Sequence, residues 1–285
     1  MYKHIQITGF SDEINPAIDE QFALLNELGI SYFDPRGVDG TNISDLTDKQ
    51  ADILVEKMKK ANIKVACLGS PIGKIEITDP IEPHLEKLKR TIEIAKKLDT
   101  KYIRMFSFFM PKGEDPAKYR DEVMRRLQLM VDIAEAEGVV LLHENEKGIY
   151  GDTAPRCKDI FDTIKSPAFS GVFDPANFIQ CGQEVYPAAI EMLKPYITYM
   201  HIKDCTAEGQ IVPAGMGVGQ IDKVFEVLLA EGYEGFACLE PHLGKFEGLA
   251  ALEQDDTMLK LEASDGKKFV LAYNSLKKIL DKVGA

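Results

Sequence analysis

The chain has 285 residues, of which 45% are hydrophobic and 28% charged. This composition is typical of folded globular proteins and argues against an intrinsically disordered protein. The formal net charge of -12 and the pI near 5.0 argue against a nucleic-acid partner, because proteins that bind phosphate backbones carry clustered Lys and Arg. No run of about 18 apolar residues occurs, so no membrane span is predicted.

The five cysteines stand singly, at Cys67, Cys157, Cys181, Cys205 and Cys238, without a C-x-x-C pair. Their odd number and wide spacing predict neither a disulfide framework nor a thiolate zinc site. The first residues enter a strand-like segment with no basic region, apolar leader or cleavage site. We therefore expect a protein of the reducing cytoplasm.

Strand-like and helix-like stretches alternate along the chain. Apolar runs typical of β-strands occupy residues 5–8, 32–34, 63–68, 102–106, 139–144, 169–174, 197–201 and 236–240. Amphipathic stretches typical of helices occupy residues 18–28, 51–61, 85–98, 121–136, 221–230 and 269–283. This order is typical of β/α units in a parallel sheet.

Capping signals mark several helix ends. Asn15 and Pro16 predict an N-cap followed by proline at the first helical position, and Thr47 with Gln50 has the spacing of a capping box. Glycines at three helix-to-strand returns predict left-handed C-caps, at Gly29, Gly138 and Gly232.

Eight β/α units with no linker between them predict an α/β fold, a single (β/α)8 TIM barrel in which residues 1–285 form one domain. An open dinucleotide-binding sheet would need G-x-G-x-x-G after the first strand, and residues 8–13 do not supply it. The least regular segment, residues 243–268, is predicted to be an extension before the last helix, suited to a lid or a homo-oligomer contact.

Four strand-like runs in the second half of the chain end in residues that bind metals or move protons, namely Glu144, Asp174, His201 and Glu240. The carboxyl ends of barrel strands surround the active site, and side chains alternate along each strand, so all four can face one ion. Three carboxylates and one imidazole form a hard ligand set, which favours Mn²⁺ or Mg²⁺ and is compatible with Co²⁺, Fe²⁺ and Zn²⁺. We predict one divalent ion, with Mn²⁺ as the leading choice. His143 has the opposite parity to Glu144 and is predicted to pack outward against a helix.

Glu144 and Glu240 are also the predicted catalytic residues. Their strands are far enough apart around the rim for the two carboxylates to flank a small substrate. One would remove a proton next to a carbonyl, and the other would return a proton to the opposite face or the adjacent carbon. Acid and base groups of this kind each supply roughly 10² to 10⁴ in rate. The hypothesis is proton transfer through an enediolate, assisted by the metal.

Further polar residues have the same inward parity. Lys203 and His242 lie two positions beyond predicted ligands, and Arg104 lies on the fourth strand, so all three are candidates for substrate binding. Arg36 is a weaker candidate. In the alternative interpretation these side chains only neutralise the acids in a structural ion-pair network. Three acids on neighbouring strands favour the metal site, because a barrel does not need them at its mouth.

The loop at residues 214–219 follows the seventh strand and reads Ala-Gly-Met-Gly-Val-Gly. Backbone N–H groups in this position often bind phosphate in barrels, which suggests a phosphorylated substrate. A turn that lets the chain approach the metal closely explains the glycines equally well.

On these residues the chain resembles the xylose isomerase-like TIM-barrel superfamily, and within it the sugar phosphate isomerase/epimerase group. The resemblance covers essentially the whole chain. Its motifs are Gly-Phe-Ser-Asp-Glu at 9–13, Ser-Pro-Ile-Gly-Lys at 70–74, His-Glu-Asn-Glu at 143–146, Phe-Asp-Pro-Ala-Asn-Phe at 173–178, His-Ile-Lys-Asp at 201–204 and Leu-Glu-Pro-His at 239–242. The last four of these motifs are the specific ones.

The resemblance implies a metal held by the four predicted ligands, with Glu144 and Glu240 as the acid/base pair of ketose 3-epimerases. Several relatives have a histidine where this chain has Asn177 and an arginine where it has Lys203, and many have a glutamate where it has Met216. We therefore expect substrate handling to differ, with Asn177 as a further candidate for substrate binding.

The superfamily also leaves alternatives open. Members with a similar His-x-Lys-Asp motif include dehydratases of cyclic polyols, so metal-dependent dehydration is an alternative to isomerisation, and a non-catalytic sugar-binding barrel is a third interpretation. A DNA repair endonuclease of the superfamily uses several zinc ions and many histidines, and the five histidines and acidic charge of this chain argue against that activity. The expected partner is a small sugar or sugar phosphate.

Overall fold

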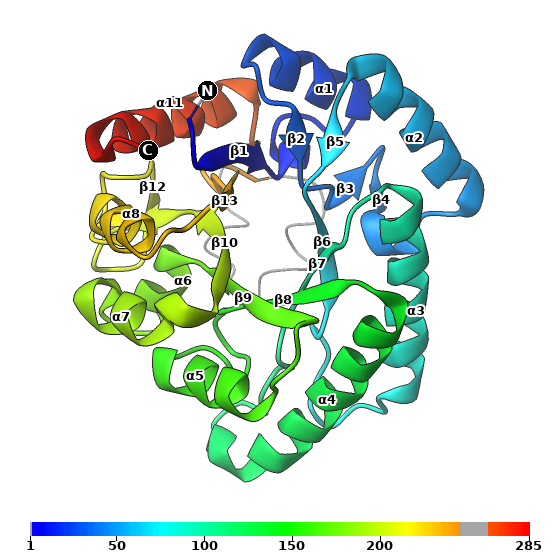
Figure 1. Ribbon diagram of the computed structural model, residues 1–285, viewed down its shortest axis with the longest axis vertical. Coiled ribbons are helices and arrows are strands. Elements are labelled where there is room, and N and C mark those ends of the chain that lie inside the picture. The colour runs from blue at the N-terminus through cyan, green and yellow to red at the C-terminus, as the bar shows by residue number, and fades with distance from the viewer. Residues whose placement is uncertain (1, 246–261) are drawn as a thin grey trace.

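The computed structural model describes residues 2–245 and 262–285, and in it a ring of strands lies inside a ring of helices (Figure 1). The predicted lid or oligomer contact falls largely on residues 246–261 and lies outside the described residues. The strands of the ring are β1 (Ile5–Gly9), β2 (Tyr32–Phe33), β5 (Lys64–Val65), β6 (Cys67–Ile72), β7 (Tyr102–Met105), β8 (Val140–Glu144), β9 (Phe169–Phe173), β10 (Ile197–Ile202) and β13 (Gly235–Leu239). Two short hairpins lie outside the ring. In the first, β3 (Gly37–Val38) pairs with β4 (Thr41–Asn42), and in the second, β11 (Asp204–Cys205) pairs with β12 (Ile211–Val212).

The ring is closed by hydrogen bonds at both edges of its main sheet. A 7-stranded parallel sheet runs in the order β1-β13-β10-β9-β8-β7-β6. Between its two edges lies β2, which pairs in parallel with β5. Next to β2, the Asp34 amide donates to the Gly9 carbonyl of β1 at 3.0 Å, and the Ala66 amide donates to the Phe33 carbonyl at 3.0 Å. The predicted TIM barrel is therefore confirmed.

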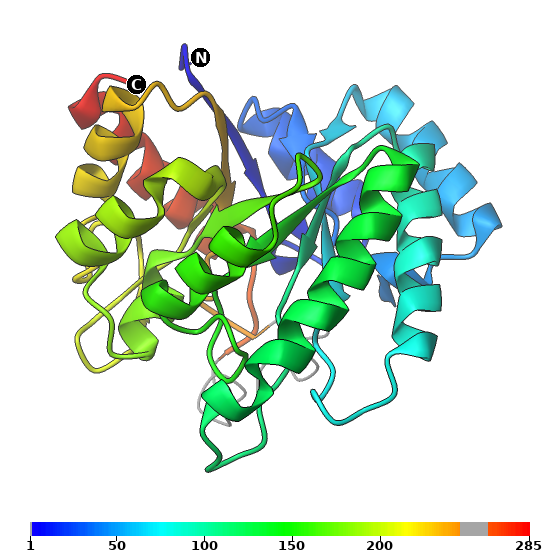
Figure 2. The same ribbon diagram turned by 60° about the horizontal axis from the view of Figure 1, so that its bottom comes forward.

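The helices cover the outside of the sheet in chain order (Figure 2). They are α1 (Ile18–Glu27), α2 (Asp48–Ala61), α3 (Glu82–Lys97), α4 (Arg120–Glu137), α5 (Ala154–Thr163), α6 (Pro175–Gln180), α7 (Ile190–Leu193), α8 (Ile221–Ala230) and α11 (Gly266–Val283). The sequence predicted α1, α2, α3, α4, α8 and α11 and missed α5, α6 and α7.

Helix capping follows the sequence at several predicted ends, including the left-handed glycines Gly29, Gly138 and Gly232, and departs from it at another. The capping box before α2 is confirmed, since the Gln50 amide donates to Thr47 Oγ1 and the Thr47 amide donates to Gln50 Oε1. The prediction that the first helix begins at Pro16 is wrong. α1 begins two residues later, because its first amide, at Ile18, donates to the side chain of Asp39 at 2.9 Å.

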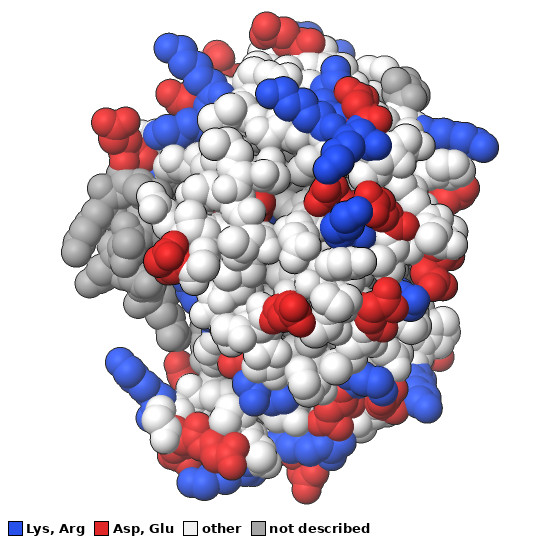
Figure 3. Space-filling model, turned by 90° about the vertical axis from the view of Figure 1, so that its left-hand side faces the viewer, with Lys and Arg blue, Asp and Glu red and all other residues white. Residues whose placement is uncertain are grey.

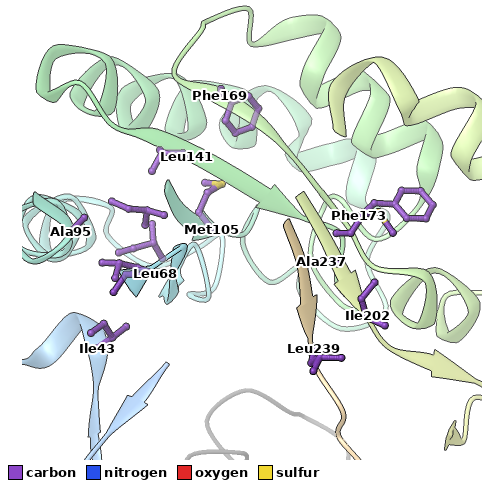
Figure 4. Close-up of a cluster of buried hydrophobic side chains, with 14 of the residues drawn as sticks. Ile43, Leu68, Ala95, Met105, Leu141, Phe169, Phe173, Ile202, Ala237 and Leu239 are labelled. Carbon is purple, nitrogen blue, oxygen red and sulfur yellow. The ribbon is translucent and has the colours of Figure 1, made fainter. Parts of the chain in front are cut away.

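Two apolar layers hold the barrel together. The larger one packs the outer face of the sheet against the helices, and Figure 4 shows part of it, including Met105, Leu141 and, on the strand paired with that of Leu141, Phe169. A smaller cluster of buried side chains comprises Phe10, Ala66, Cys67, Leu142, Val172, Tyr199 and Cys238. The strands are thus filled on both faces, which is typical of a packed barrel and leaves polar groups to gather at its ends.

The surface carries charges of both signs. On the face in Figure 3, acidic and basic side chains are interspersed around a broad uncharged area. A face of this kind offers no continuous positive potential to a phosphate backbone. Among the described residues, no helix is long and apolar enough to cross a bilayer.

Candidate metal centre

The four predicted ligands lie together and buried at the carboxyl ends of their strands, at Glu144, Asp174, His201 and Glu240. Each offers one ligand atom, and these atoms lie within 4.8 Å of one another. Glu144 pairs with Val172, two positions before Asp174, and His201 pairs with Cys238, two positions before Glu240. This stagger comes from the tilt of the strands in a closed barrel. It brings residues that are not paired across the sheet to the same height, in one layer of inward side chains at the barrel mouth.

His201 lies between the two glutamates. Its Nδ1 is 2.9 Å from Glu144 Oε1 and 3.0 Å from Glu240 Oε2. Burial acts to lower the pKa of His201, but the two carboxylates override it and raise the pKa to about 10. Without a metal, the protonated imidazole therefore supplies a positive charge between the acids.

Asp174 is fixed by a short local network. Its Oδ1 accepts the Asn177 amide at 2.9 Å and so caps α6, while the Asn145 side chain bonds both the amide and the carbonyl of Asp174 at 2.9 Å. The other oxygen, Oδ2, lies 3.0 Å from the Lys203 ammonium. Burial raises the pKa of Asp174 to about 7, although Lys203 opposes the shift.

Glu240 is surrounded by positively charged or protonatable groups. Its Oε1 lies 3.1 Å from His242 Nε2, 3.6 Å from Lys203 Nζ and 3.7 Å from Arg36 Nη1. Burial acts against ionisation, but Lys203, His242 and His201 lower the pKa of Glu240 below its usual range. The carboxylate is therefore ionised in the metal-free protein, as a metal ligand must be.

Each predicted substrate-binding residue contacts one of the predicted ligands. Arg104 Nη1 is 3.2 Å from Glu144 Oε2, and Asn177 Nδ2 donates to Glu144 Oε1 at 3.4 Å. Lys203 and His242 contact Asp174 and Glu240 as described above. The geometry brings these side chains to the predicted centre, and their role toward a substrate stays a prediction.

Two carboxylates that the sequence did not single out also reach this layer. Asp12 and Glu13 lie in the 3₁₀ turn after β1 (Ser11–Glu13), and both are buried. Arg36 Nε is 2.9 Å from Asp12 Oδ2 and its Nη2 is 3.3 Å from Glu13 Oε1, while the His242 amide donates to Glu13 Oε2 at 2.8 Å. These contacts hold Arg36 and His242 beside Glu240. The position directly after a barrel strand was the signal that could have identified both acids.

A second possible ligand group lies on the other side of His201. Asp34, His201 and Cys238 offer ligand atoms within 4.8 Å of one another. Asp34 already accepts hydroxyl hydrogen bonds from Thr8 and Tyr199, at 2.7 Å each. Burial raises the pKa of the Cys238 thiol well above its usual range, so the thiol keeps its proton. We interpret this group as a hydrogen-bonded cluster next to His201 and not as a second metal site, because a metal would need the thiolate.

The glycine loop does not present an open phosphate cradle. The amides of Gly215, Gly217 and Gly219 donate to the carboxylate of Asp204 at 2.9, 3.1 and 3.0 Å. The Cys205 amide adds a further bond at 2.9 Å, and Asp204 is fully buried. The donors that suggested a phosphorylated substrate are thus occupied by a carboxylate of the protein itself.

Asp204→Ala should lower the free energy of unfolding by about 3 kcal/mol, because buried backbone donors lose a charged acceptor. Chemical denaturation would measure the change. Asp121→Ala is the matched control, since the Asp121 side chain is 99% exposed and its loss should change stability by less than about 0.5 kcal/mol. Equal, small effects of the two substitutions would refute the structural role of Asp204.

Glu144, Asp174, His201 and Glu240, called the quartet below, fit a divalent cation. Adjacent ligands of an octahedral ion with bonds of about 2.1 Å lie about 3.0 Å apart, close to the two distances measured around His201 Nδ1. Asp174 Oδ2 and Glu240 Oε2 are buried and make no hydrogen bond of good geometry to a described residue, and their contacts are ion pairs with Lys203 Nζ and His201 Nδ1, at 3.0 Å each. Buried carboxylate oxygens held in this way can take a further partner, and a metal ion is a partner that this donor set suits.

His143 confirms the parity argument made from the sequence. Its ring faces away from the quartet and packs against Phe161 of α5, with the ring centroids 5.9 Å apart. Its Nε2 lies 2.9 Å from Ser107 Oγ. Burial lowers the pKa of His143 to about 3, so the imidazole is neutral.

A family model described as xylose isomerase-like TIM barrel matches residues 22–260 of this chain. No curated protein matches it in sequence. Among solved structures, a D-tagatose 3-epimerase-like protein has a TM-score of 0.74 at 18% identity, with 98% of each chain covered.

Two further solved structures share the fold. A probable 3-DHS dehydratase of petrobactin synthesis from Bacillus anthracis has a TM-score of 0.70 at 15% identity, with coverage of 97% of this chain and 98% of that one. The IOLI protein, solved with a binding zinc atom, has a TM-score of 0.73 at 19% identity, with coverage of 98% and 99%. At these identities the likeness shows the fold alone.

Proposed function

This chain belongs to the xylose isomerase-like TIM barrel family, and on that premise we propose that it is a metal-dependent isomerase or epimerase of a small sugar. The observation that carries the proposal is the buried quartet, in which Glu144 and Glu240 flank His201 at 2.9 and 3.0 Å. Similarity to a D-tagatose 3-epimerase-like protein supports the same class of reaction. The reaction would be proton transfer through an enediolate.

In this proposal Glu144, Asp174, His201 and Glu240 hold the divalent ion. When bound there, the ion polarises a substrate carbonyl or hydroxyl and makes the neighbouring C–H more acidic. The hard donor set supports Mn²⁺, and the zinc in the IOLI protein makes Zn²⁺ its main competitor. Elemental analysis of the purified protein, followed by reconstitution of the stripped protein with each metal, would identify the ion.

The proton-moving groups are the two glutamates. One removes the proton next to the carbonyl, and the other returns a proton to the opposite face or to the adjacent carbon. Arg104 and Asn177 keep Glu144 in position by contacts of 3.2 and 3.4 Å. Lys203 and His242, beside Glu240, are the groups proposed to bind substrate oxygens or to deliver a proton to them.

A metal-dependent dehydratase is the second candidate. It is supported by the similarity to a probable 3-DHS dehydratase and by the Lys203 ammonium, which lies 3.6 Å from Glu240 and could protonate a leaving oxygen. A sugar-binding barrel without catalysis is the third candidate, because the same contacts could bind a sugar without turning it over.

Hydrogen exchange in D₂O separates these candidates. An isomerase or epimerase loaded with Mn²⁺ should exchange the hydrogen next to the carbonyl, seen as loss of its proton NMR signal, and should release no water. A dehydratase should produce an enone that absorbs in the ultraviolet. A panel of ketoses, aldoses and inososes that stabilises the protein thermally but is never turned over would leave only the binding barrel. Protein stripped of metal serves as the control and should show no exchange.

A further inference from the structure

From the ion pairs and hydrogen bonds around the quartet, we infer that the substrate is an uncharged sugar or polyol, without a phosphate or carboxylate group. The inference rests on the proposed function and narrows its substrate class. Two independent features of the described residues carry it. These are the occupied glycine loop and the pairing of the cationic side chains in the layer.

The glycine loop has no room to take a substrate phosphate in place of Asp204. Its three glycine amides already donate to that carboxylate. The packing is close, because a Cβ added at Gly217 would lie 2.2 Å from the Cys205 carbonyl oxygen and 2.4 Å from Asp204 Oδ1. A phosphate could reach these donors only if it displaced a buried aspartate of the same charge sign.

Four buried Lys and Arg side chains near the quartet each have a carboxylate partner. Arg36 is 2.9 Å from Asp12, Arg104 is 3.2 Å from Glu144, and Lys203 is 3.0 Å from Asp174. Lys74 is 3.2 Å from Glu146, and both of these side chains are at most 10% exposed. A substrate anion would have to compete with an internal carboxylate for each of these cations.

Carboxylates outnumber cations among these ion pairs and the quartet. Six carboxylates take part in them, namely Asp12, Glu13, Glu144, Glu146, Asp174 and Glu240. The four cations of the preceding paragraph leave two negative charges, which one divalent ion neutralises. A phosphate dianion would restore two uncompensated negative charges in a buried site, and desolvating unpaired charge is unfavourable.

Several polar side chains of the site can exchange a present contact for a bond to a hydroxyl oxygen. Asn177 has an amide, His242 an imidazole and Glu240 a carboxylate, and these can donate to or accept from a sugar hydroxyl without a change in net charge. The chemistry at the rim thus matches a neutral polyol bound through hydrogen bonds and the ion.

The test compares matched neutral and charged ligands on the protein loaded with Mn²⁺ at fixed free metal. Titration calorimetry would measure the affinity for D-fructose and sorbitol, for their 6-phosphates, for D-gluconate and for inorganic phosphate, and D₂O exchange would be followed with each ketose. We expect the neutral ligands to bind at least ten times more tightly than their 6-phosphates. Inorganic phosphate should show no binding to the protein beyond the binding that it shows to free Mn²⁺ alone.

Glu146→Gln is a variant that should gain affinity for phosphorylated ligands. It removes the carboxylate beside Lys74, so the ratio of affinities should shift toward the 6-phosphates by about tenfold. Glu234→Gln is the matched control, since the Glu234 side chain is 74% exposed and lies next to His4, far from the barrel mouth. No shift with Glu146→Gln would overturn the role given to the paired cations.

The outcomes separate this inference from the proposed function. Tighter binding and exchange of a 6-phosphate would overturn the neutral substrate and leave the isomerase intact. Tighter binding of neutral sugars without exchange or turnover of any sugar would support the neutral ligand and overturn the isomerase. Failure of every sugar and polyol to bind would overturn both.

Discussion

Glu240→Gln should lower the rate of hydrogen exchange in D₂O by about 10³ to 10⁴ while the variant still binds Mn²⁺ and the same sugar. The amide keeps an oxygen for the metal but cannot carry a proton, and general acid or base groups typically contribute about 10² to 10⁴ in rate. The loss should lie near the upper end, because Glu240 also holds His242 and Lys203, at 3.1 and 3.6 Å. Exchange kinetics at saturating metal and sugar would measure it.

Two comparison variants and one outcome make the assignment of Glu240 refutable. Glu144→Gln should remove metal and activity together, since Glu144 also anchors His201 and Arg104. Glu234→Gln applies the same chemical change to an exposed side chain and should leave exchange unchanged. If Glu240→Gln binds the sugar normally and exchanges hydrogen at the original rate, the acid/base role is excluded.

The sequence predicted that the four residues of the quartet lie together, because in a barrel the position of a residue along its strand fixes its height relative to the barrel mouth. Glu144, Asp174, His201 and Glu240 each stand at or just after the end of a strand, and inward parity repeats every second residue. The same rule placed His143 outward. These inferences need only the strand ends, which short apolar runs define well.

Contacts between distant turns could not be predicted in the same way. Asp12 bonds Arg36 24 residues away, and Glu13 bonds the His242 amide 229 residues away. Such pairs depend on how β1, β2 and β13 meet when the barrel closes. No local pattern of charges in the turn after β1 fixes those partners.

The sequence left the role of the glycine loop open for a related reason. Residues 214–219 reveal backbone donors, but the acceptor is Asp204, which precedes Gly215 by 11 residues. A phosphate and a buried carboxylate demand similar donors, so the sequence pattern fits either one. α6 was missed because it has only 6 residues and is capped by a predicted metal ligand, Asp174.

Metal binding should tighten by about 1,000-fold between pH 6 and pH 8. In the metal-free protein the pKa of His201 is raised to about 10 by the carboxylates despite its burial, and burial raises the pKa of Asp174 to about 7. Both groups hold protons at pH 6, and both must release them to bind a metal. Affinity should therefore rise by about 100-fold per pH unit below the Asp174 pKa and by about tenfold per unit above it.

The same shifts fix the sign of the stability change. A raised pKa for His201 stabilises the metal-free fold fully below pH 6.5, and that stabilisation is lost as the pH rises toward 10. A raised pKa for Asp174 stabilises it below pH 3.8, and this contribution is lost as the pH passes 7. Rising pH thus weakens the metal-free protein while it strengthens metal binding, so the difference in Tm between the loaded and stripped protein should widen from pH 6 to pH 8.

Titration calorimetry in two buffers of different ionisation enthalpy would count the released protons directly. We expect close to two protons per metal at pH 6 and close to one at pH 8. His201→Gln should lower both counts by one, because the amide brings no proton, whereas His4→Gln, remote from the quartet, should change neither. A metal affinity that stays constant between pH 6 and pH 8 would mean that the ion does not replace protons among these four side chains, and the quartet would then be an ion-pair network instead of a metal centre.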